Sequence, residues 1–318
     1  MRVFVAGATG VLGVPVVRRL VARGDEVVGL TRSDAGAEAL AALGAEATLA
    51  DARDAPALRA AVIAARPDAV VHLLTALAGR TLRTAADLAP TNLLRTEATR
   101  TLLDAASSAG ARRFVAESMI FVYGYGDHGP HPLAEQAPVA GAVEGAETRA
   151  AFEGLRSLEA QVMEATRAWR VEGVVLRFGI LYGPGASDGA VAALRRRAFP
   201  LPRSGPAILS VVHVDDAADA VLLALDRARP GEVYNVAEDE PAPLRELYAA
   251  LARAAGAPAP RLLPRFIARR LAPYGAALFE TRLVASSGRA REALGWTPRH
   301  GWRESIAGDV GAAPTHPA

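Results

Sequence analysis

Short apolar runs alternate with longer amphipathic stretches along the first half of the chain. The apolar runs predict strands at residues 2–6, 26–30, 45–49, 68–74, 113–116 and 173–178. The longer stretches predict helices at residues 11–22, 35–43, 55–65, 92–109 and 153–169. Strands that alternate with helices in this way form βαβ units, and such units build a parallel sheet with both faces covered.

The pattern loosens after residue 178, where Pro and Gly interrupt residues 183–206 and 256–264. Two further helices are expected near residues 215–225 and 244–255. We therefore predict an α/β fold, a Rossmann-type doubly wound parallel sheet with a small C-terminal lobe. In the helix at 153–169, the residues Leu155, Leu158, Val162 and Trp169 share one stripe and are expected to be buried.

Composition excludes several kinds of chemistry. The 318 residues include no cysteine, and a scan shows that all 36 basic residues are arginine. Disulfides, thiolate nucleophiles, Schiff-base lysines and P-loop lysines are therefore excluded. A formal net charge of +2 gives no reason to expect nucleic-acid binding, and no apolar run reaches the roughly 18 residues that span a bilayer. The chain starts without the features of a signal peptide, so we expect a cytoplasmic protein without a membrane partner.

A glycine-rich segment at residues 7–13 is the strongest local motif, and it reads GATGVLG. It directly follows the first predicted strand and opens the first predicted helix. In this position Gly7 permits the tight turn, Gly10 lets the backbone approach a pyrophosphate, and Gly13 lets the helix pack closely. The segment therefore predicts a dinucleotide site.

The end of the second predicted strand indicates which dinucleotide binds. NAD enzymes usually place an acid there to hold the ribose, whereas this chain has Arg32 followed by Ser33. An arginine beside hydroxyl groups suits a 2′-phosphate, so NADP is preferred. The nearby Asp34 leaves NAD open.

Motifs spread over nearly the whole chain resemble those of the extended short-chain dehydrogenase/reductases, the NAD-dependent epimerase/dehydratase group. They lie at residues 7–13, 51–54, 70–76, 121–124, 177–185, 212–220, 231–236 and 294–298. The resemblance implies an NAD(P)-binding Rossmann domain at 1–178, completed by parts of 207–236. It also implies a substrate-binding lobe at 179–206 and 237–310, a disordered tail at 311–318, and a homodimer through helices near 92–109 and 153–170.

The same resemblance implies which residues contact the cofactor. They are Gly7, Thr9, Gly10, Val11, Leu12, Gly13, Arg32, Ser33, Asp51, Ala52, Leu74, Thr75, Asn92, Arg156, Phe178 and Leu181.

The chain departs from this family at the catalytic residues, which are usually a Ser, a Tyr and a Lys. The position of the Ser holds Met119, and Ser118 lies one residue before it. Aligned on Glu159, the Tyr and Lys become Ala151 and Leu155. With a shift of one residue they become Phe152 and Arg156. Both registers lack the phenol and the lysine, so the usual proton transfer is excluded.

Glu117, Ser118 and Tyr123 are the candidates for replacement catalytic residues, because they follow the fifth predicted strand. Burial at a strand end is expected to raise the pKa of the Glu117 carboxyl and to suit it to proton transfer. His72 lies in an apolar strand and is expected to be a core residue, and Asp215 is expected to cap a helix. No residues have the spacing of metal ligands, so no metal is expected.

Three functions remain open at this level. The first is an NADP-dependent oxidoreductase that acts on a small-molecule carbonyl or alcohol with a non-standard proton donor. The second is an epimerase, dehydratase or lyase of the same fold, and the third is a non-catalytic NADP(H) sensor. The apolar and basic segment at 262–279 favours an aromatic or polyketide-like small molecule over a nucleotide sugar.

Overall fold

The computed structural model describes residues 1–77, 82–140, 145–203 and 205–310. The predicted tail at 311–318 lies outside these residues. The main sheet is made of β1 (Arg2–Ala6), β2 (Glu26–Thr31), β3 (Glu46–Leu49), β4 (Ala69–His72), β5 (Arg113–Met119), β6 (Glu172–Phe178) and β11 (Val233–Val236). Its seven strands are all parallel, in the order β11-β6-β5-β4-β1-β2-β3. The order changes direction between β1 and β4, where doubly wound sheets bind their ligands.

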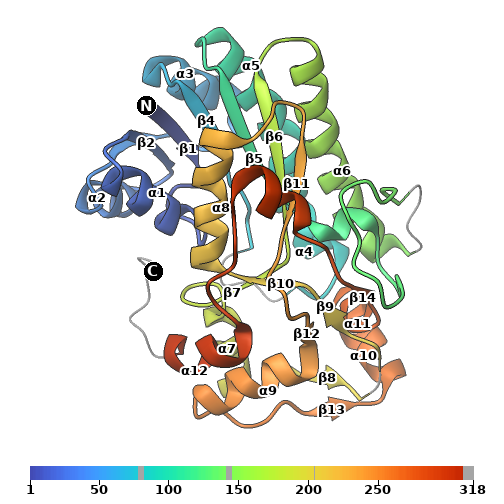
Figure 1. Cartoon of the computed structure of the whole chain (residues 1–318). Coiled ribbons are helices and arrows are strands. Elements are labelled where there is room, and N and C mark those ends of the chain that lie inside the picture. The colour runs from blue at the N-terminus through green and yellow to red at the C-terminus, as the bar shows by residue number, and fades with distance from the viewer. Residues whose placement is uncertain (78–81, 141–144, 204, 311–318) are drawn as a thin grey trace.

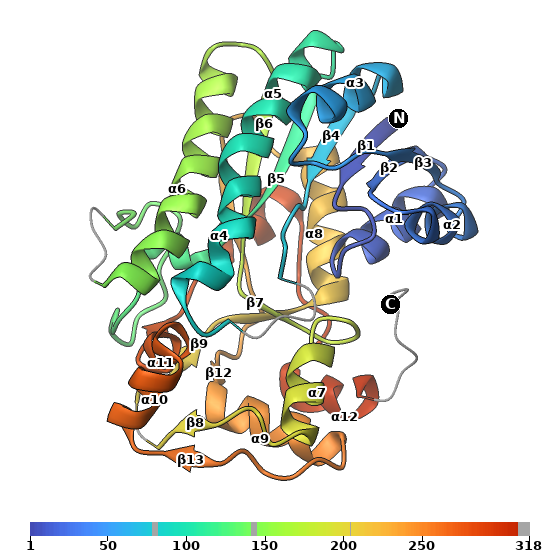
Figure 2. The same ribbon diagram turned by 180° about the vertical axis from the view of Figure 1, so that it is seen from behind.

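Helices cover both faces of this sheet, as predicted (Figures 1 and 2). One face carries α1 (Gly13–Ala22), α2 (Asp34–Ala42) and α8 (Val214–Arg227). The other carries α3 (Ala55–Ala65), α5 (Thr99–Ser108) and α6 (Ala146–Arg167). The alternation of side chains along β1 explains both layers, since Val3 and Val5 join the first core while Phe4 and Ala6 join the second. The Rossmann-type fold class is therefore confirmed.

A smaller group of elements, which we call the C-terminal lobe, lies at the carboxyl ends of the strands (Figure 1). Its helices are α7 (Asp188–Arg195), α9 (Leu244–Ala254), α10 (Arg265–Leu271), α11 (Pro273–Phe279) and α12 (Trp302–Asp309). Its short strands are β8 (Leu201–Pro202), β9 (Ile208–Leu209), β12 (Ala242–Pro243), β13 (Leu262–Leu263) and β14 (Arg282–Leu283). The pair β7 (Ile180–Tyr182) and β10 (Val211–His213) connects the lobe to the sheet.

The structure differs from the predicted elements in several places, among them the start of α6 at Ala146 instead of residue 153 and the end of β5 at Met119 instead of residue 116. The helix expected at 92–109 starts earlier, because α4 (Ala85–Leu93) continues through a π-turn, η1 (Leu94–Ala98), into α5. The helix α6 ends at Arg167, so Trp169 adopts a φ of 55° and is 95% exposed instead of joining the buried stripe. The helix α8 is capped by His213, whose side chain accepts from the backbone N–H of Asp215.

Two short helical segments complete the fold, namely the 3₁₀ turn η2 (Ile120–Tyr123) after β5 and the π-turn η3 (Ala290–Leu294). No helix in the described ranges is both long and apolar enough to cross a membrane.

Candidate active site

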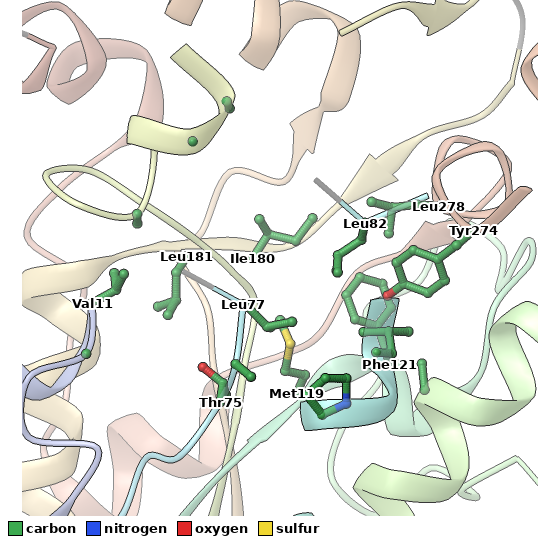
Figure 3. Close-up of a pocket in the computed structure, with 18 of the residues that line it drawn as sticks. Val11, Thr75, Leu77, Leu82, Met119, Phe121, Ile180, Leu181, Tyr274 and Leu278 are labelled. Atoms are coloured by element: carbon green, nitrogen blue, oxygen red, sulfur yellow. The ribbon is translucent and has the colours of Figure 1, made fainter. Parts of the chain in front are cut away.

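A cavity of about 750 Å³ runs from the glycine-rich loop, past the ends of β4 and β5, to the C-terminal lobe. Apolar side chains dominate its centre. In Figure 3, Val11 and Thr75 lie at the sheet side, Met119 and Phe121 near the middle, and Tyr274 at the lobe. The cavity therefore lies at the position that the reversal of strand order predicts.

The backbone of the glycine-rich loop is packed so tightly that Gly7 and Gly13 have no room for a side chain. Gly7 adopts a φ of +96°, and a Cβ there would lie 2.6 Å from the carbonyl oxygen of Leu73. A Cβ at Gly13 would lie 2.0 Å from the carbonyl oxygen of Gly7. The loop leads directly into α1, so its backbone is a cradle for a diphosphate at a helix N-terminus. The residues present therefore fit a dinucleotide.

The end of the cavity that would take the adenosine is polar. Arg53 donates to Asp51 from Nη2 to Oδ2 at 2.6 Å, and this hydrogen bond lowers the pKa of Asp51 to about 2. Arg32 is exposed at the end of β2, lines the cavity, and forms no ion pair with any described residue. Ser33 instead caps α2, because its hydroxyl accepts from the backbone N–H of Gly36. Among the described residues at this end of the cavity, Arg32 is thus the cation that has no acidic partner and could bind a ligand.

Most of the residues predicted to contact the cofactor line the cavity. They are Gly7, Thr9, Gly10, Val11, Leu12, Arg32, Asp51, Ala52, Leu74, Thr75 and Leu181. The remaining predicted residues, Gly13, Ser33, Asn92, Arg156 and Phe178, do not line it. Asn92 joins two helices, since its side-chain amide donates to the carbonyl of Ala150 at 2.8 Å. Arg156 is exposed and Phe178 is in the core.

The residues of the two predicted registers differ in whether they line the middle of the cavity. Met119, Ala151 and Leu155 line the cavity, whereas Phe152 and Arg156 do not. The register is fixed one helical turn further on, where Glu159 is buried. Met119, Ala151 and Leu155 therefore form an apolar wall in the middle of the cavity.

Glu159 belongs to a buried ion pair beneath this wall. Arg177 donates from Nε and Nη2 to the two carboxylate oxygens of Glu159, at 2.9 and 2.7 Å. Ser118 also donates to Glu159, at 2.7 Å. The guanidinium of Arg177 lies 4.8 Å from the centre of the Tyr123 ring.

The predicted catalytic residues Ser118 and Tyr123 consequently need correction. The hydroxyl of Ser118 is committed to Glu159, and that of Tyr123 donates to Asn235 Oδ1 at 2.9 Å. Neither side chain lines the cavity. Both side chains therefore bond to other protein groups outside the cavity lining. They are not placed to transfer a proton to a substrate in the cavity.

Glu117 is the one predicted catalytic residue that lines the cavity. Burial raises the pKa of Glu117 to about 7, although the positive charge of Arg95 acts in the opposite direction. Arg95 itself lines the cavity from η1 and is only 4% exposed. Beside it, the hydroxyls of Tyr125 and Tyr274 form a hydrogen bond of 3.1 Å. Arg95 and Tyr274 are cavity residues that the sequence analysis did not identify.

His72, His213 and His300 have structural partners among the described residues. His72 is buried, its Nε2 lies 2.9 Å from the hydroxyl of Thr99, and burial lowers its pKa to about 3. His213, Asp215 and His300 have potential ligand atoms within 4.8 Å of one another. His213 contacts Asp309 at 3.2 Å, and His300 contacts Asp216 at 3.0 Å. These contacts hold α8 and α12 together.

Comparison with known proteins adds the family. The sequence model described as "NAD dependent epimerase/dehydratase family" matches residues 3–237. A Streptomyces protein described as 3-diazoavenalumate denitrifying reductase is 42% identical, over 96% of this chain and 99% of its own length. The 2′-dehydrokanamycin reductase of Streptomyces kanamyceticus is 34% identical, over 81% of this chain and 68% of its own length.

Solved structures show the same fold. The UDP-glucose 4-epimerase of Thermus thermophilus, in complex with NAD, superposes with a TM-score of 0.79 at 25% identity. The match covers 98% of this chain and 100% of that chain.

Proposed function

Because the chain belongs to the NAD-dependent epimerase/dehydratase family, we propose that it is an NADP(H)-dependent reductase that removes nitrogen from an aromatic diazo compound. The named relatives are reductases and epimerases, so the chain is an enzyme and an oxidoreductase activity fits it. The finer assignment depends on one observation. The wall formed by Met119, Ala151 and Leu155 holds no group that exchanges protons.

Hydride transfer to an arenediazonium needs no proton donor. When bound, a reduced nicotinamide would supply a hydride, which is two electrons and one proton. In the substrate, a C–H bond forms at the ring carbon while the C–N bond breaks, and its electron pair leaves with N₂. Charge and atoms balance without a further proton. A carbonyl reduction, by contrast, must place a proton on the new alkoxide oxygen.

The residues of the apolar wall have a second role in such a reaction. An arenediazonium is hydrolysed by water to a phenol, so a productive site has to be dry. Ala151 and Leu155 are buried, and they lie beside Met119 in the cavity. Their side chains exclude water from the space where a substrate ring meets the cofactor.

The relative that is 42% identical supports this substrate class, because its description names a diazo acid and a denitrifying reduction. One observation favours a second function. Glu117 lines the cavity and has a pKa raised to about 7 by burial, so it is suited to give a proton to a carbonyl oxygen. An NADPH-dependent carbonyl reductase is therefore the alternative.

We expect deuterium from [4-²H]NADPH to appear at the ring carbon that carried nitrogen, with one N₂ released for each cofactor oxidised. The probe is 3-diazo-4-hydroxycinnamate, with 4-hydroxycinnamaldehyde as the carbonyl comparison, and the products are analysed by NMR and mass spectrometry. Glu117→Gln should leave the diazo reaction within about threefold, because the chemistry uses no acid. Reduction of the aldehyde alone, with a loss of about 100-fold in Glu117→Gln, would instead establish the alternative function.

We expect Arg32→Ala to weaken NADPH binding by more than about tenfold while leaving NADH binding unchanged, since a charged hydrogen bond contributes roughly 1.5–3 kcal/mol. The reason is that Arg32 is the cavity cation at the end of β2 without an acidic partner among the described residues. The measurement is a fluorescence titration with both cofactors. Arg18→Ala is the matched control, because Arg18 is exposed on α1 and does not line the cavity. Equal losses for NADPH and NADH would contradict a 2′-phosphate contact.

The homodimer also stays a proposal. The helices α5 and α6 pack against each other on one face of the sheet, and α6 exposes Glu153, Arg156 and Ala160 on its outer side. A second copy would pack against these outer faces.

A further inference from the structure

Arg95 is a buried cation without a direct partner among the described residues. Its side chain is only 4% exposed, yet no hydrogen bond from its guanidinium and no carboxylate within 4 Å of it is found there. Burial of an unpaired charge is costly, and proteins normally retain it only for a purpose. Arg95 lines the cavity, so the partner that it lacks can be supplied by a ligand.

The groups around Arg95 do not fully neutralise its charge. Glu117 is the acid whose charge acts on Arg95, but burial raises the pKa of Glu117 to about 7, so this carboxyl is only partly ionised at neutral pH. Three further groups interact electrostatically with Arg95. Tyr274 and Tyr125 bond to each other through their hydroxyls, and His72 is neutral at neutral pH because burial lowers its pKa to about 3. Burial raises the pKa of both phenols, so both are neutral. Arg95 therefore places a positive charge in a part of the cavity that is otherwise apolar.

The surroundings define the chemistry of the missing partner. Phe121 stacks on Tyr125 at 5.1 Å between ring centres, and Leu88, Ala151 and Tyr274 pack together. All five residues line the cavity, so a flat apolar ligand would be held between aromatic and aliphatic walls. A guanidinium matches the two oxygens of a carboxylate in a bidentate geometry.

We infer that Arg95 is a substrate-binding residue that holds the carboxylate of an aromatic acid, with the rest of the acid lying along the apolar wall. The inference rests on the proposed function, because it specifies the substrate of the same site. The inference gives each end of the substrate its own contacts with the protein. The acid end is fixed by Arg95, and the ring is thereby directed towards Met119 and Leu155.

The test is a binding experiment that needs no turnover. 4-Hydroxycinnamate, which has no diazo group, is titrated by calorimetry into the enzyme saturated with NADP⁺, and the titration is repeated with its carboxamide. We expect the wild type to bind the acid more than about tenfold more tightly than the amide. Arg95→Met should bind both equally, with unchanged affinity for the amide. Arg95→Lys should retain part of the preference.

Arg83→Met is the matched control, because Arg83 is an exposed cation that lines the same cavity. This variant should keep the preference for the acid. The inference is overturned if the wild type does not distinguish acid from amide, or if Arg83→Met removes the preference. It is also overturned if Arg95→Met weakens NADP⁺ binding and leaves the preference intact.

Thermal unfolding of each variant shows whether it is folded. If Arg95→Met does not fold, the wild-type preference and its reduction in Arg95→Lys decide the question. If the wild type binds the acid through Arg95 but does not reduce the diazo probe, the proposed function is refuted and the role of Arg95 is retained.

Discussion

Gly13→Ala should reduce the affinity for NADPH by at least about 100-fold, even though it adds a single methyl group. The Cβ would lie 2.0 Å from the carbonyl oxygen of Gly7 and 2.8 Å from the carbonyl carbon and oxygen of Ala8. These neighbours are backbone atoms, so the side chain cannot rotate away and the loop itself must move. Because that loop forms the diphosphate cradle, its displacement removes several charge-assisted hydrogen bonds together.

Calorimetric titration with NADPH measures this loss, and Gly308→Ala is the control. Gly308 lies in α12, and a Cβ there meets nothing within 4 Å. An alanine at this helical position should leave binding unchanged and is expected to stabilise the helix slightly. If Gly13→Ala retains folding and binds NADPH like the wild type, residues 7–13 do not form the cofactor cradle.

The sheet and the dinucleotide loop could be predicted from the sequence because both depend on local patterns. Alternating apolar and amphipathic segments place β1 at Arg2–Ala6 and α3 at Ala55–Ala65, where the structure has them. The expectation was wrong for Trp169, because helical periodicity says nothing about where a helix ends. Once α6 ends at Arg167, the stripe no longer continues, and the ring of Trp169 faces solvent.

The substrate end of the cavity was much harder to predict, since it is assembled from segments that are far apart in sequence. Tyr125 and Tyr274 bond to each other across 149 positions. From the sequence, Arg95 resembles a surface residue of an amphipathic helix. In the structure it lies in the π-turn η1, and its side chain lines the cavity. The sequence does show that the chain has no lysine. It could not choose between the two registers, because that choice depends on the spatial pairing of Glu159 with Arg177.

That same pair gives the largest expected effect on stability. Glu159→Ala should lower the free energy of unfolding by about 3–5 kcal/mol, because it leaves a charge buried and unpaired. Arg177 is only 4% exposed, and two of its three nitrogen atoms donate to Glu159. Its Nη1 has no hydrogen-bond partner among the described residues, so the carboxylate of Glu159 is its direct ionic partner there. The substitution also leaves the hydroxyl of Ser118 without its acceptor.

Denaturant unfolding followed by circular dichroism measures this cost, with Glu97→Ala as the control. Glu97 pairs with Arg100 at 2.6 Å, but both side chains are more than half exposed, so its loss should cost less than about 1 kcal/mol. The double variant Glu159→Met and Arg177→Met should recover much of the stability, since it removes the charge as well as its partner. Equal costs for Glu159→Ala and Glu97→Ala would show that the buried pair does not hold α6 to β6. The register that places Ala151 and Leu155 in the cavity would then have to be maintained by apolar packing alone.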